Sequence, residues 1–215
     1  MKGSSGYQIR RCVREACGLR YPLVAGHLYG ERCPRCGAST QLVDSRPIER
    51  EPIQSSKRNN SFHLEAILDN IRSAWNVGSI FRTSDGLGIC KLHLCGLTPT
   101  PENPKVLKTS LGAEASVAWR QANDGVREAQ ALRAQGYHLW ALEYTPGSES
   151  LLDISPLQRE QPYCLVVGNE IAGIDPGILD LCERLVYIPM LGSKRSFNVA
   201  VAFGIAAYYI LDNFT

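Results

Sequence analysis

The sequence lacks a long hydrophobic run, and its first residues lack the apolar core of a secretory signal. No uninterrupted apolar stretch approaches the ~20 residues that a membrane-spanning helix needs, so we expect no transmembrane segment and no membrane partner. Residues 1–11 contain no signal-like apolar run, so the expected compartment is the cytoplasm. Glycine (19 of 215 residues) and proline (12) are too scarce for a collagen-like or low-complexity chain.

Two common nucleotide-binding fingerprints are also missing. The chain has no Gly-x4-Gly-Lys-Ser/Thr phosphate loop. The Gly86-Leu87-Gly88 segment ends a predicted helix, whereas a Gly-x-Gly-x-x-Gly dinucleotide motif follows a strand. The ordinary phosphate-loop and dinucleotide folds are therefore not indicated.

Charge is distributed unevenly along the chain. Residues 1–60 contain eleven Lys/Arg against five Asp/Glu, whereas residues 61–215 contain twelve against sixteen. A basic appendage on a mildly acidic body fits a polyanionic partner such as nucleic acid. The alternative is that these cations only keep a small module soluble. If RNA is the partner, six arginines of the appendage are the expected phosphate contacts: Arg10, Arg11, Arg14, Arg20, Arg32 and Arg35.

Four of the eight cysteines lie close together near the N-terminus. Cys33 and Cys36 flank Pro34-Arg35 in a tight knuckle, and Cys12 and Cys17 form a looser pair fifteen residues before it. Four thiolates at this spacing predict a tetrahedral structural Zn²⁺ site, with the insert long enough for a short hairpin. Disulfides are the alternative, although nothing indicates secretion. His27 is a less favoured substitute ligand.

The other four cysteines are scattered through apolar stretches of the body. Buried cysteine behaves as a small hydrophobic residue, so we interpret them as structural, with a catalytic thiol as the less favoured alternative. They are Cys90, Cys95, Cys164 and Cys182.

The chain divides into four segments. We expect a tail or cloning scar at 1–6, a zinc-ribbon-like module at 7–42, a linker at 43–60 and a body at 61–215. The body alternates strands and helices, which predicts an α/β fold with a mostly parallel sheet covered by helices on both faces. The predicted strands are His63–Leu68, Ile89–Cys95, Tyr137–Leu142, Tyr163–Val167 and Leu185–Ile188. The predicted helices are Val77–Leu87, Asn103–Ser110, Asp124–Gln135, Pro176–Cys182 and Phe197–Leu211, the last apolar on nearly every side.

The first candidate functional segment lies at the start of the helix that follows the first strand of the body. Asn76 is interpreted as its N-cap. Gly78 would lie in its first turn, where backbone can approach a ligand closely. Arg82 stands in an otherwise apolar stretch, so we expect it to be half-buried, with either an anionic ligand or a salt-bridge partner.

Two further polar segments follow predicted strands. Gly168-Asn169-Glu170 ends one strand, and Ile188-Pro189-Met190 ends another before a loop that reaches Ser196-Phe197-Asn198. In parallel sheets, ligands bind just beyond the carboxyl ends of strands, so these turns predict a site. Met190 would contact an apolar or sulfur-bearing ligand, or else pack in the core.

The three segments, in this order, resemble the signature motifs of the SpoU/TrmH-like RNA ribose 2′-O-methyltransferases of the SPOUT class. Asn76 and Arg82 match Asn-x5-Arg, and Gly168 and Glu170 match Gly-x-Glu. Ile188-Pro189-Met190 and Ser196-Phe197-Asn198 match Ile-Pro-Met … Ser-Leu-Asn, with Phe in place of Leu. The resemblance covers about residues 61–215 and does not include the cysteine module.

The resemblance implies a fold and a cofactor that the residues alone do not. It implies a C-terminal trefoil knot and a homodimer formed through the knot region. It also implies S-adenosylmethionine as cofactor, with the methyl group facing Arg82 and Glu170. The matching cofactor-binding positions are Leu142, Glu143, Gly168, Ile188, Met190, Ser196 and Phe197.

The same resemblance implies methyl transfer to a ribose 2′-hydroxyl of tRNA or rRNA. Arg82 would take the proton or stabilise the developing alkoxide as a cation. The other catalytic positions, which would orient Arg82, the ribose and the cofactor, are Asn76, Glu170, Ser196 and Asn198. Two alternatives stay open: a non-catalytic RNA-binding or assembly protein with the knotted fold, and an unrelated α/β enzyme with a zinc ribbon.

Overall fold

The computed structural model describes residues 6–27, 30–47, 63–154, 157–158 and 160–213. Its contacts divide the chain into two compact units, Met1–Arg58 and Asn59–Thr215. No helix among the described residues is long and apolar enough to cross a bilayer.

The first unit is a three-stranded antiparallel sheet in the order β2-β1-β3. Its strands are β1 (Gly6–Cys12), β2 (Arg20–Val24) and β3 (Thr40–Pro47). The insert between the cysteine pairs, which is long enough for a short hairpin, supplies β2, and β2 pairs with the preceding β1. β3 extends into the segment expected to be a linker, because it pairs with β1 up to Pro47. The rest of that linker lies outside the described residues.

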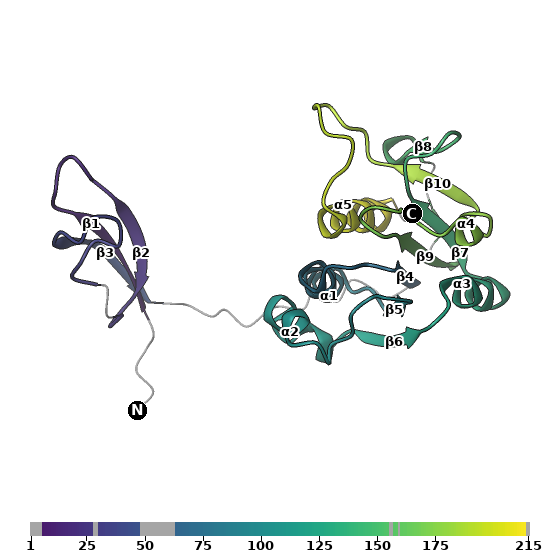
Figure 1. The fold of residues 1–215 in the computed structure, drawn as a ribbon, viewed down its shortest axis with the longest axis horizontal. Coiled ribbons are helices and arrows are strands. Elements are labelled where there is room, and N and C mark those ends of the chain that lie inside the picture. Colours follow the sequence, from purple (N-terminus) through teal and green to yellow (C-terminus); the bar gives the residue numbers. More distant parts are fainter. Residues whose placement is uncertain (1–5, 28–29, 48–62, 155–156, 159, 214–215) are drawn as a thin grey trace. The chain divides into compact units, whose positions relative to one another are not determined.

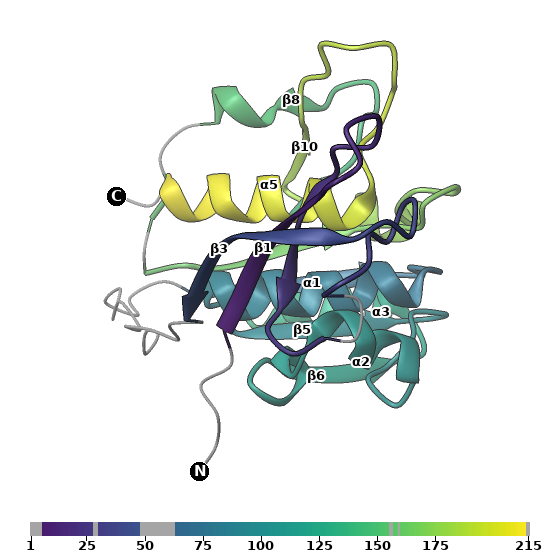
Figure 2. The same ribbon diagram turned by 90° about the vertical axis from the view of Figure 1, so that its left-hand side faces the viewer.

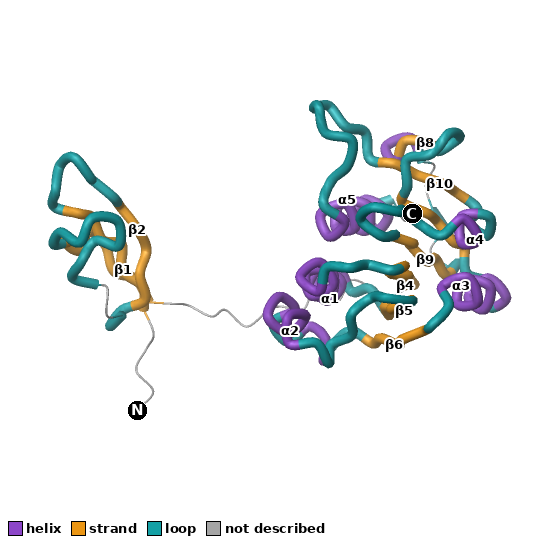
Figure 3. The backbone as a smooth tube through the Cα atoms, in the orientation of Figure 1, coloured by secondary structure: helices purple, strands orange, loops and turns teal. Residues whose placement is uncertain are grey.

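The second unit contains a seven-stranded sheet in the order β6-β5-β4-β9-β7-β10-β8, and all its strand pairs are parallel. This confirms the predicted parallel sheet (Figure 1). The predicted strands correspond to β4 (His63–Asp69), β5 (Lys91–Cys95), β7 (His138–Leu142), β9 (Pro162–Val167) and β10 (Arg184–Tyr187). β6 (Ala118–Ala122) and β8 (Glu149–Ser150) were not predicted. Loops and turns, teal in Figure 3, follow the carboxyl ends of the strands.

Helices cover both faces of this sheet, as predicted (Figure 1). One face carries α1 (Ala74–Leu87), α2 (Pro104–Ser110) and α5 (Val199–Asp212), and the other carries α3 (Gly125–Ala134) and α4 (Pro176–Leu179). Two short 3-10 turns complete the unit, at Ala113–Ala115 and Leu151–Asp153. α1 and α5 run side by side in both views (Figures 1 and 2). The trefoil knot stays a prediction.

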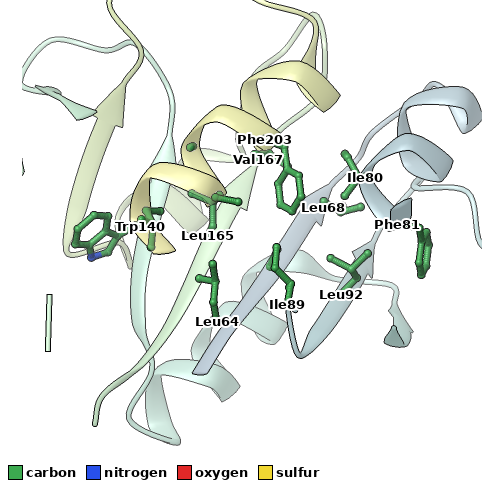
Figure 4. Close-up of a cluster of buried hydrophobic side chains, with 14 of the residues drawn as sticks. Leu64, Leu68, Ile80, Phe81, Ile89, Leu92, Trp140, Leu165, Val167 and Phe203 are labelled. Carbon is green, nitrogen blue, oxygen red and sulfur yellow. The ribbon is translucent and has the colours of Figure 1, made fainter. Parts of the chain in front are cut away.

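The larger apolar cluster lies between the sheet and the α1/α5 layer (Figure 4). Phe81 of α1 and Phe203 of α5 are fully buried there, together with Leu64, Leu68 and Leu165 of the central strands. A second cluster packs the opposite face of the sheet against α3 and α4. Burial on both faces explains why the central strands are almost continuously apolar.

Helix α1 begins earlier than the sequence predicts. Ser73 is its N-cap, and its Oγ accepts a hydrogen bond from the Asn76 backbone N–H at 3.3 Å. Asn76 therefore lies inside the helix, so its predicted N-cap role is wrong. Gly78 lies beyond the first turn, and an added Cβ there would be 2.3 Å from the Val106 carbonyl oxygen. That glycine allows α2 to pack against α1 and does not open the backbone to a ligand.

Helix α5 begins two residues later than predicted, with Asn198 as its N-cap. One side is buried through Phe203, Ala206 and Ile210. Its other side leaves Val201 51% exposed and Tyr208 53% exposed. The apolar character all round the helix therefore reflects one face in the core and one uncovered face. α4 is shorter than expected and ends at Leu179.

Candidate active site and metal centre

The Glu170 side chain joins the turn after β9 to the start of α1. Its carboxylate accepts hydrogen bonds from the backbone N–H groups of Arg72 at 2.9 Å and Ser73 at 3.1 Å. It also accepts one from Asn76 Nδ2 at 3.0 Å. A carboxylate at a helix N-terminus is favoured because unpaired N–H groups and the helix dipole meet there.

Asn76 extends this contact to the third motif. Its Oδ1 accepts a hydrogen bond from Asn198 Nδ2 at 3.0 Å. Asn198 Oδ1 in turn accepts from the Ala200 N–H at 2.9 Å and caps α5. Three segments that are far apart in sequence thus form one chain of hydrogen bonds, Glu170–Asn76–Asn198, called here the motif network.

The electrostatics of the motif network follow from these contacts. Partial burial raises the pKa of Glu170, but the hydrogen bonds from the Arg72 N–H, the Asn76 side chain and the Ser73 N–H outweigh it. The net result is a pKa below the ordinary value of a glutamate. Glu170 is therefore a carboxylate at neutral pH, acting as an acceptor that fixes its neighbours.

A cavity of about 580 Å³ opens beside the motif network. Its walls are the segments that follow β7, β9 and β10, the last being the long loop before α5 in Figure 3. Glu170 and Asn198 line it. The structure brings all seven expected cofactor positions to this cavity: Leu142, Glu143, Gly168, Ile188, Met190, Ser196 and Phe197.

The wall after β9 is a closely packed turn. A Cβ on Gly168 would lie 2.4 Å from the Gly173 carbonyl carbon, so only glycine fits there. Asn169 Oδ1 accepts from the backbone N–H of Ile171 at 2.9 Å and of Ala172 at 3.0 Å. The turn is therefore held by its own side chain and by a backbone approach that excludes a larger residue.

Arg82 does not line this cavity. It is exposed on α1, and its guanidinium makes no hydrogen bond or ion pair with any residue that the structure describes. The expectation of a half-buried arginine is wrong, because the apolar neighbours of Arg82 point into the core while its own side of the helix stays uncovered. An unpaired exposed guanidinium remains available to an anionic substrate.

The segment that contains these features matches a known family model. The model of the SpoU rRNA Methylase family matches residues 63–208. The chain belongs to the SpoU methylase family. This membership excludes the unrelated α/β enzyme, and it agrees with the order of the three motifs.

Several SpoU relatives are similar over most of this chain. A 23S rRNA (guanosine-2′-O-)-methyltransferase of Vibrio parahaemolyticus is 30% identical over 172 residues, covering 80% of this chain and 68% of the relative. A tRNA (guanosine(18)-2′-O)-methyltransferase of Aquifex aeolicus is 28% identical over 146 residues, covering 67% of each. The chain spans only 62% and 56% of the lengths of two further curated relatives, from Staphylococcus haemolyticus and Bacillus subtilis.

Solved structures of methyltransferases have folds similar to that of this chain. The crystal structure of an AdoMet-bound rRNA methyltransferase from Sinorhizobium meliloti has a TM-score of 0.66 and 27% identity, and the match covers 71% of this chain and 57% of that one. A SpoU methyltransferase from Streptomyces viridochromogenes has a TM-score of 0.61 and 26% identity, covering 82% and 68%.

Some cavity residues of this SpoU domain were missed by the sequence reasoning. Tyr144 and Tyr187 line the cavity, and their rings meet edge to face with centroids 5.1 Å apart. Arg195 also lines it. Tyr187 ends β10 and Tyr144 follows β7 closely, so the rule that ligands bind at strand ends would have found both.

The four N-terminal cysteines lie outside the SpoU match but gather in one place. Their sulfur atoms all lie within 4.8 Å of one another, with Cys12 Sγ 3.5 Å from Cys36 Sγ and Cys17 Sγ 3.8 Å from Cys33 Sγ. Tetrahedral zinc with Zn–S bonds of about 2.3 Å places its sulfurs about 3.8 Å apart, so the cluster fits a structural Zn²⁺. These separations are far beyond a disulfide bond, and all eight cysteines are free.

Proposed function

We propose that this SpoU-family protein transfers a methyl group from S-adenosylmethionine to a ribose 2′-hydroxyl of tRNA or rRNA. The observation that carries the proposal is the motif network, two members of which line the cavity that all seven expected cofactor positions also line. The names of the relatives support it, since two of them are rRNA and tRNA guanosine 2′-O-methyltransferases, and one related structure is AdoMet-bound.

The cavity residues would hold the cofactor mainly with backbone groups at three strand ends. Gly168 lines the cavity after β9, and Ile188 and Met190 line it after β10. Glu143 is partly engaged already, since its Oε2 accepts the Ile174 N–H at 3.2 Å. S-adenosylmethionine bound there would supply an electrophilic methyl group.

The motif network would orient the reacting groups. Glu170 fixes the start of α1 and the Asn76 amide, and Asn198 ties that amide to the cap of α5. Ser196 lies on the cavity wall beside them. None of these groups has to move a proton for this role, which fits a glutamate that stays ionised.

Arg82 is the proposed partner of the ribose 2′-hydroxyl. An alcohol is a weak nucleophile, so a group must take its proton or stabilise the negative charge that develops on its oxygen. Guanidinium is very rarely deprotonated, and the unpaired Arg82 favours the cationic role. Arg82→Lys keeps the charge but loses the planar fork, so we expect at least a tenfold loss of methyl transfer. A near-normal rate would exclude any role that needs guanidinium geometry.

We also propose a homodimer formed through α5. Its uncovered face borders a hollow of about 880 Å³ that is lined by Ser79 and Thr83 of α1 and by Val201, Ile205 and Tyr208 of α5. A second copy would cover these apolar side chains. Light scattering should show a dimer for the native chain and a monomer for Ile205→Glu. Leu97→Glu, on an exposed leucine elsewhere, should stay dimeric.

The domain organisation and compartment complete the proposal. A zinc-binding module that includes β1 to β3 would precede a methyltransferase domain that begins near His63. A zinc site made of four cysteine thiolates requires reduced cysteines, which supports the cytoplasm as the compartment.

The first test is calorimetric titration with S-adenosylhomocysteine, the stable product. We expect micromolar binding that disappears in Gly168→Val, because the larger side chain cannot fit against Gly173. Transfer of a labelled methyl group to total cellular RNA would then identify the substrate. A folded protein that binds RNA but not S-adenosylhomocysteine would instead support the non-catalytic RNA-binding or assembly protein.

A further inference from the structure

The sheet of the N-terminal unit has two faces with different chemistry. Residues directly opposite each other on neighbouring strands point to the same face, and successive residues point to opposite faces. Arg10 shares one face with Cys12 of the metal cluster. Its guanidinium is occupied there, donating from Nε to Thr40 Oγ1 at 2.9 Å and from Nη1 to Gln8 Oε1 at 3.1 Å.

The opposite face carries two arginines side by side. Arg11 of β1 is directly opposite Arg20 of β2, and Gln41 of β3 flanks Arg11 on the other side. Both arginines are exposed, and neither forms a hydrogen bond or an ion pair with any described residue. Like charges directly opposite each other destabilise a sheet, so this pair has no evident structural benefit.

One acidic residue, Asp44, lies on this same face because it is directly opposite Ile9 of β1, and it is paired with a different arginine. Asp44 Oδ2 accepts from Arg46 Nε at 2.9 Å, and this contact lowers the pKa of Asp44 more than the more distant Arg20 does. The described residues of the module include seven arginines but only three acidic residues. Arg11 and Arg20 therefore form no ion pair with any described residue, and the attraction of Asp44 for Arg20 is weaker than its attraction for Arg46.

An aromatic ring and apolar side chains continue the same face. Tyr7 is directly opposite Val24 on β2 and Arg46 on β3, two alternations along β1 from Arg11. Val24 is 53% exposed and Tyr7 is half-buried. We call the set Tyr7, Ile9, Arg11, Arg20, Val24 and the ion pair of Asp44 with Arg46 the basic face.

We propose that the basic face binds an unpaired segment of the RNA substrate, with Arg11 and Arg20 on phosphates and Tyr7 stacked on a base. This inference rests on the proposed function for the identity of the polyanion. Basic side chains beside a partly exposed aromatic ring are the combination that single-stranded nucleic acid requires, because phosphates contact the cations while bases stack on the ring. Arg10, although equally basic in sequence, is assigned no such contact.

The test compares charge removal on the basic face with the same charge removal elsewhere on the module. Arg11→Gln/Arg20→Gln and the matched control Arg14→Gln/Arg35→Gln would be made in the full zinc-loaded chain. Binding to a fluorescent single-stranded RNA would be followed by anisotropy across a salt series. We expect the first variant to lose at least tenfold in affinity near 0.1 M salt. Its log–log salt slope should become shallower by about 1.4, as for two lost phosphate contacts.

The control variant should lose less than threefold, because the proposal confines the phosphate contacts to the basic face and so removes Arg14 and Arg35 from the contacts expected from charge alone. Equal losses in the two variants would overturn the proposal, since total charge and not one face would then control binding. Unchanged affinity in the basic-face variant would overturn it as well.

Tyr7 tests the stacking step separately. Tyr7→Phe should bind like the native chain, whereas Tyr7→Leu should lose about five- to tenfold for single-stranded RNA. The stacking would be overturned if Tyr7→Leu bound single-stranded RNA with native affinity and the native chain bound duplex RNA as tightly as single-stranded RNA. Titration of the same samples with S-adenosylhomocysteine separates the two proposals. A native chain that does not bind S-adenosylhomocysteine would contradict the proposed function. The basic-face proposal would still be decided by the RNA affinities of its own variants.

Discussion

The two units of this chain are stabilised internally by different kinds of core. In the described part of the N-terminal unit, the buried apolar residues are Cys12 and Cys33, both metal-ligand candidates, while Val13, Val24 and Leu42 stay more than half exposed. The C-terminal unit instead buries two apolar layers, one on each face of its sheet. One unit has a core of sulfur atoms and the other has a core of hydrocarbon.

The difference shows how size decides the source of stability. A segment of about forty residues cannot bury enough apolar surface to offset its chain entropy, so a metal must contribute most of the folding free energy. A unit of about 150 residues has no such need. Each unit should therefore lose its structure through changes that leave the other intact.

The largest effect should come from the metal centre. Cys33→Ser, or removal of zinc by a chelator, should unfold the N-terminal unit, because structural zinc contributes about 10–16 kcal/mol in small modules. NMR spectra should lose the β1–β3 signals, while S-adenosylhomocysteine titration of the C-terminal unit stays unchanged. Cys90→Ser, a half-buried cysteine of the C-terminal unit, is the control and should keep one zinc per chain. A Cys33→Ser variant that kept dispersed β1–β3 signals would show that the N-terminal unit folds without its metal.

Removal of a buried hydrocarbon side chain should destabilise the C-terminal unit and leave the N-terminal unit unchanged. Phe203→Ala removes a fully buried ring beneath α5 and should destabilise the C-terminal unit by about 3–5 kcal/mol. Thermal unfolding with parallel zinc analysis should show a lower transition temperature and unchanged metal content. Leu97→Ala, at a leucine that is 76% exposed, should change stability by less than about 0.5 kcal/mol. Zinc loss in Phe203→Ala would show that the units depend on each other.

A third effect concerns buried charge on the α3 face of the sheet. Glu65 Oε2 lies 2.6 Å from His93 Nε2, and His93 Nδ1 lies 2.5 Å from Glu128 Oε1. Burial raises the pKa of Glu65, but the hydrogen bonds from His93, His63 and Tyr137 outweigh it and lower the pKa to about 2.

The sign of the pH dependence follows from that lowered pKa. A carboxylate with a depressed folded-state pKa adds stability above its unfolded value of about 4.3, and this is lost as the pH falls towards 2. Denaturant unfolding between pH 5 and 2 should show that loss. Glu65→Gln should be destabilised by about 2 kcal/mol at pH 7 and should respond less to acid. As a control, Glu102→Gln at an exposed position should behave like the native chain. If all three proteins lost the same unfolding free energy between pH 5 and 2, that loss could not be assigned to Glu65.

The same contrast explains which parts of the molecule the sequence could predict. The central strands are apolar on both faces, so β4 and β9 stand out as runs, and the four cysteines reveal their cluster by spacing. β6 was missed because this edge strand has no fully buried residue, and β8 because it has only two residues. Local patterns detect burial and turn chemistry well, but they carry little signal for a polar sheet edge.

For the site, strand-end turns and motif order brought the correct segments together, while the contacts between them were not predictable. The Asn76–Asn198 hydrogen bond joins residues 122 positions apart, and nothing local indicates it. Both Ser73 and Asn76 are good capping residues, and only the folded chain shows that Ser73 caps α1. The exposure of Arg82 likewise depends on which elements pack beside α1.

The smallest effect on stability separates folding from function within the C-terminal unit. Asn198→Asp keeps an oxygen to cap α5 but loses the Nδ2 donor to Asn76, whereas Asn198→Ala loses both contacts. We expect Asn198→Ala to cost about 1 kcal/mol and Asn198→Asp only a few tenths, because Asp and Asn are comparable caps. Methyl transfer should fall at least tenfold in both variants, since each frees the Asn76 amide. If activity instead followed stability, with Asn198→Asp near the native rate, Asn198 would matter as a helix cap and the motif network would end at Asn76.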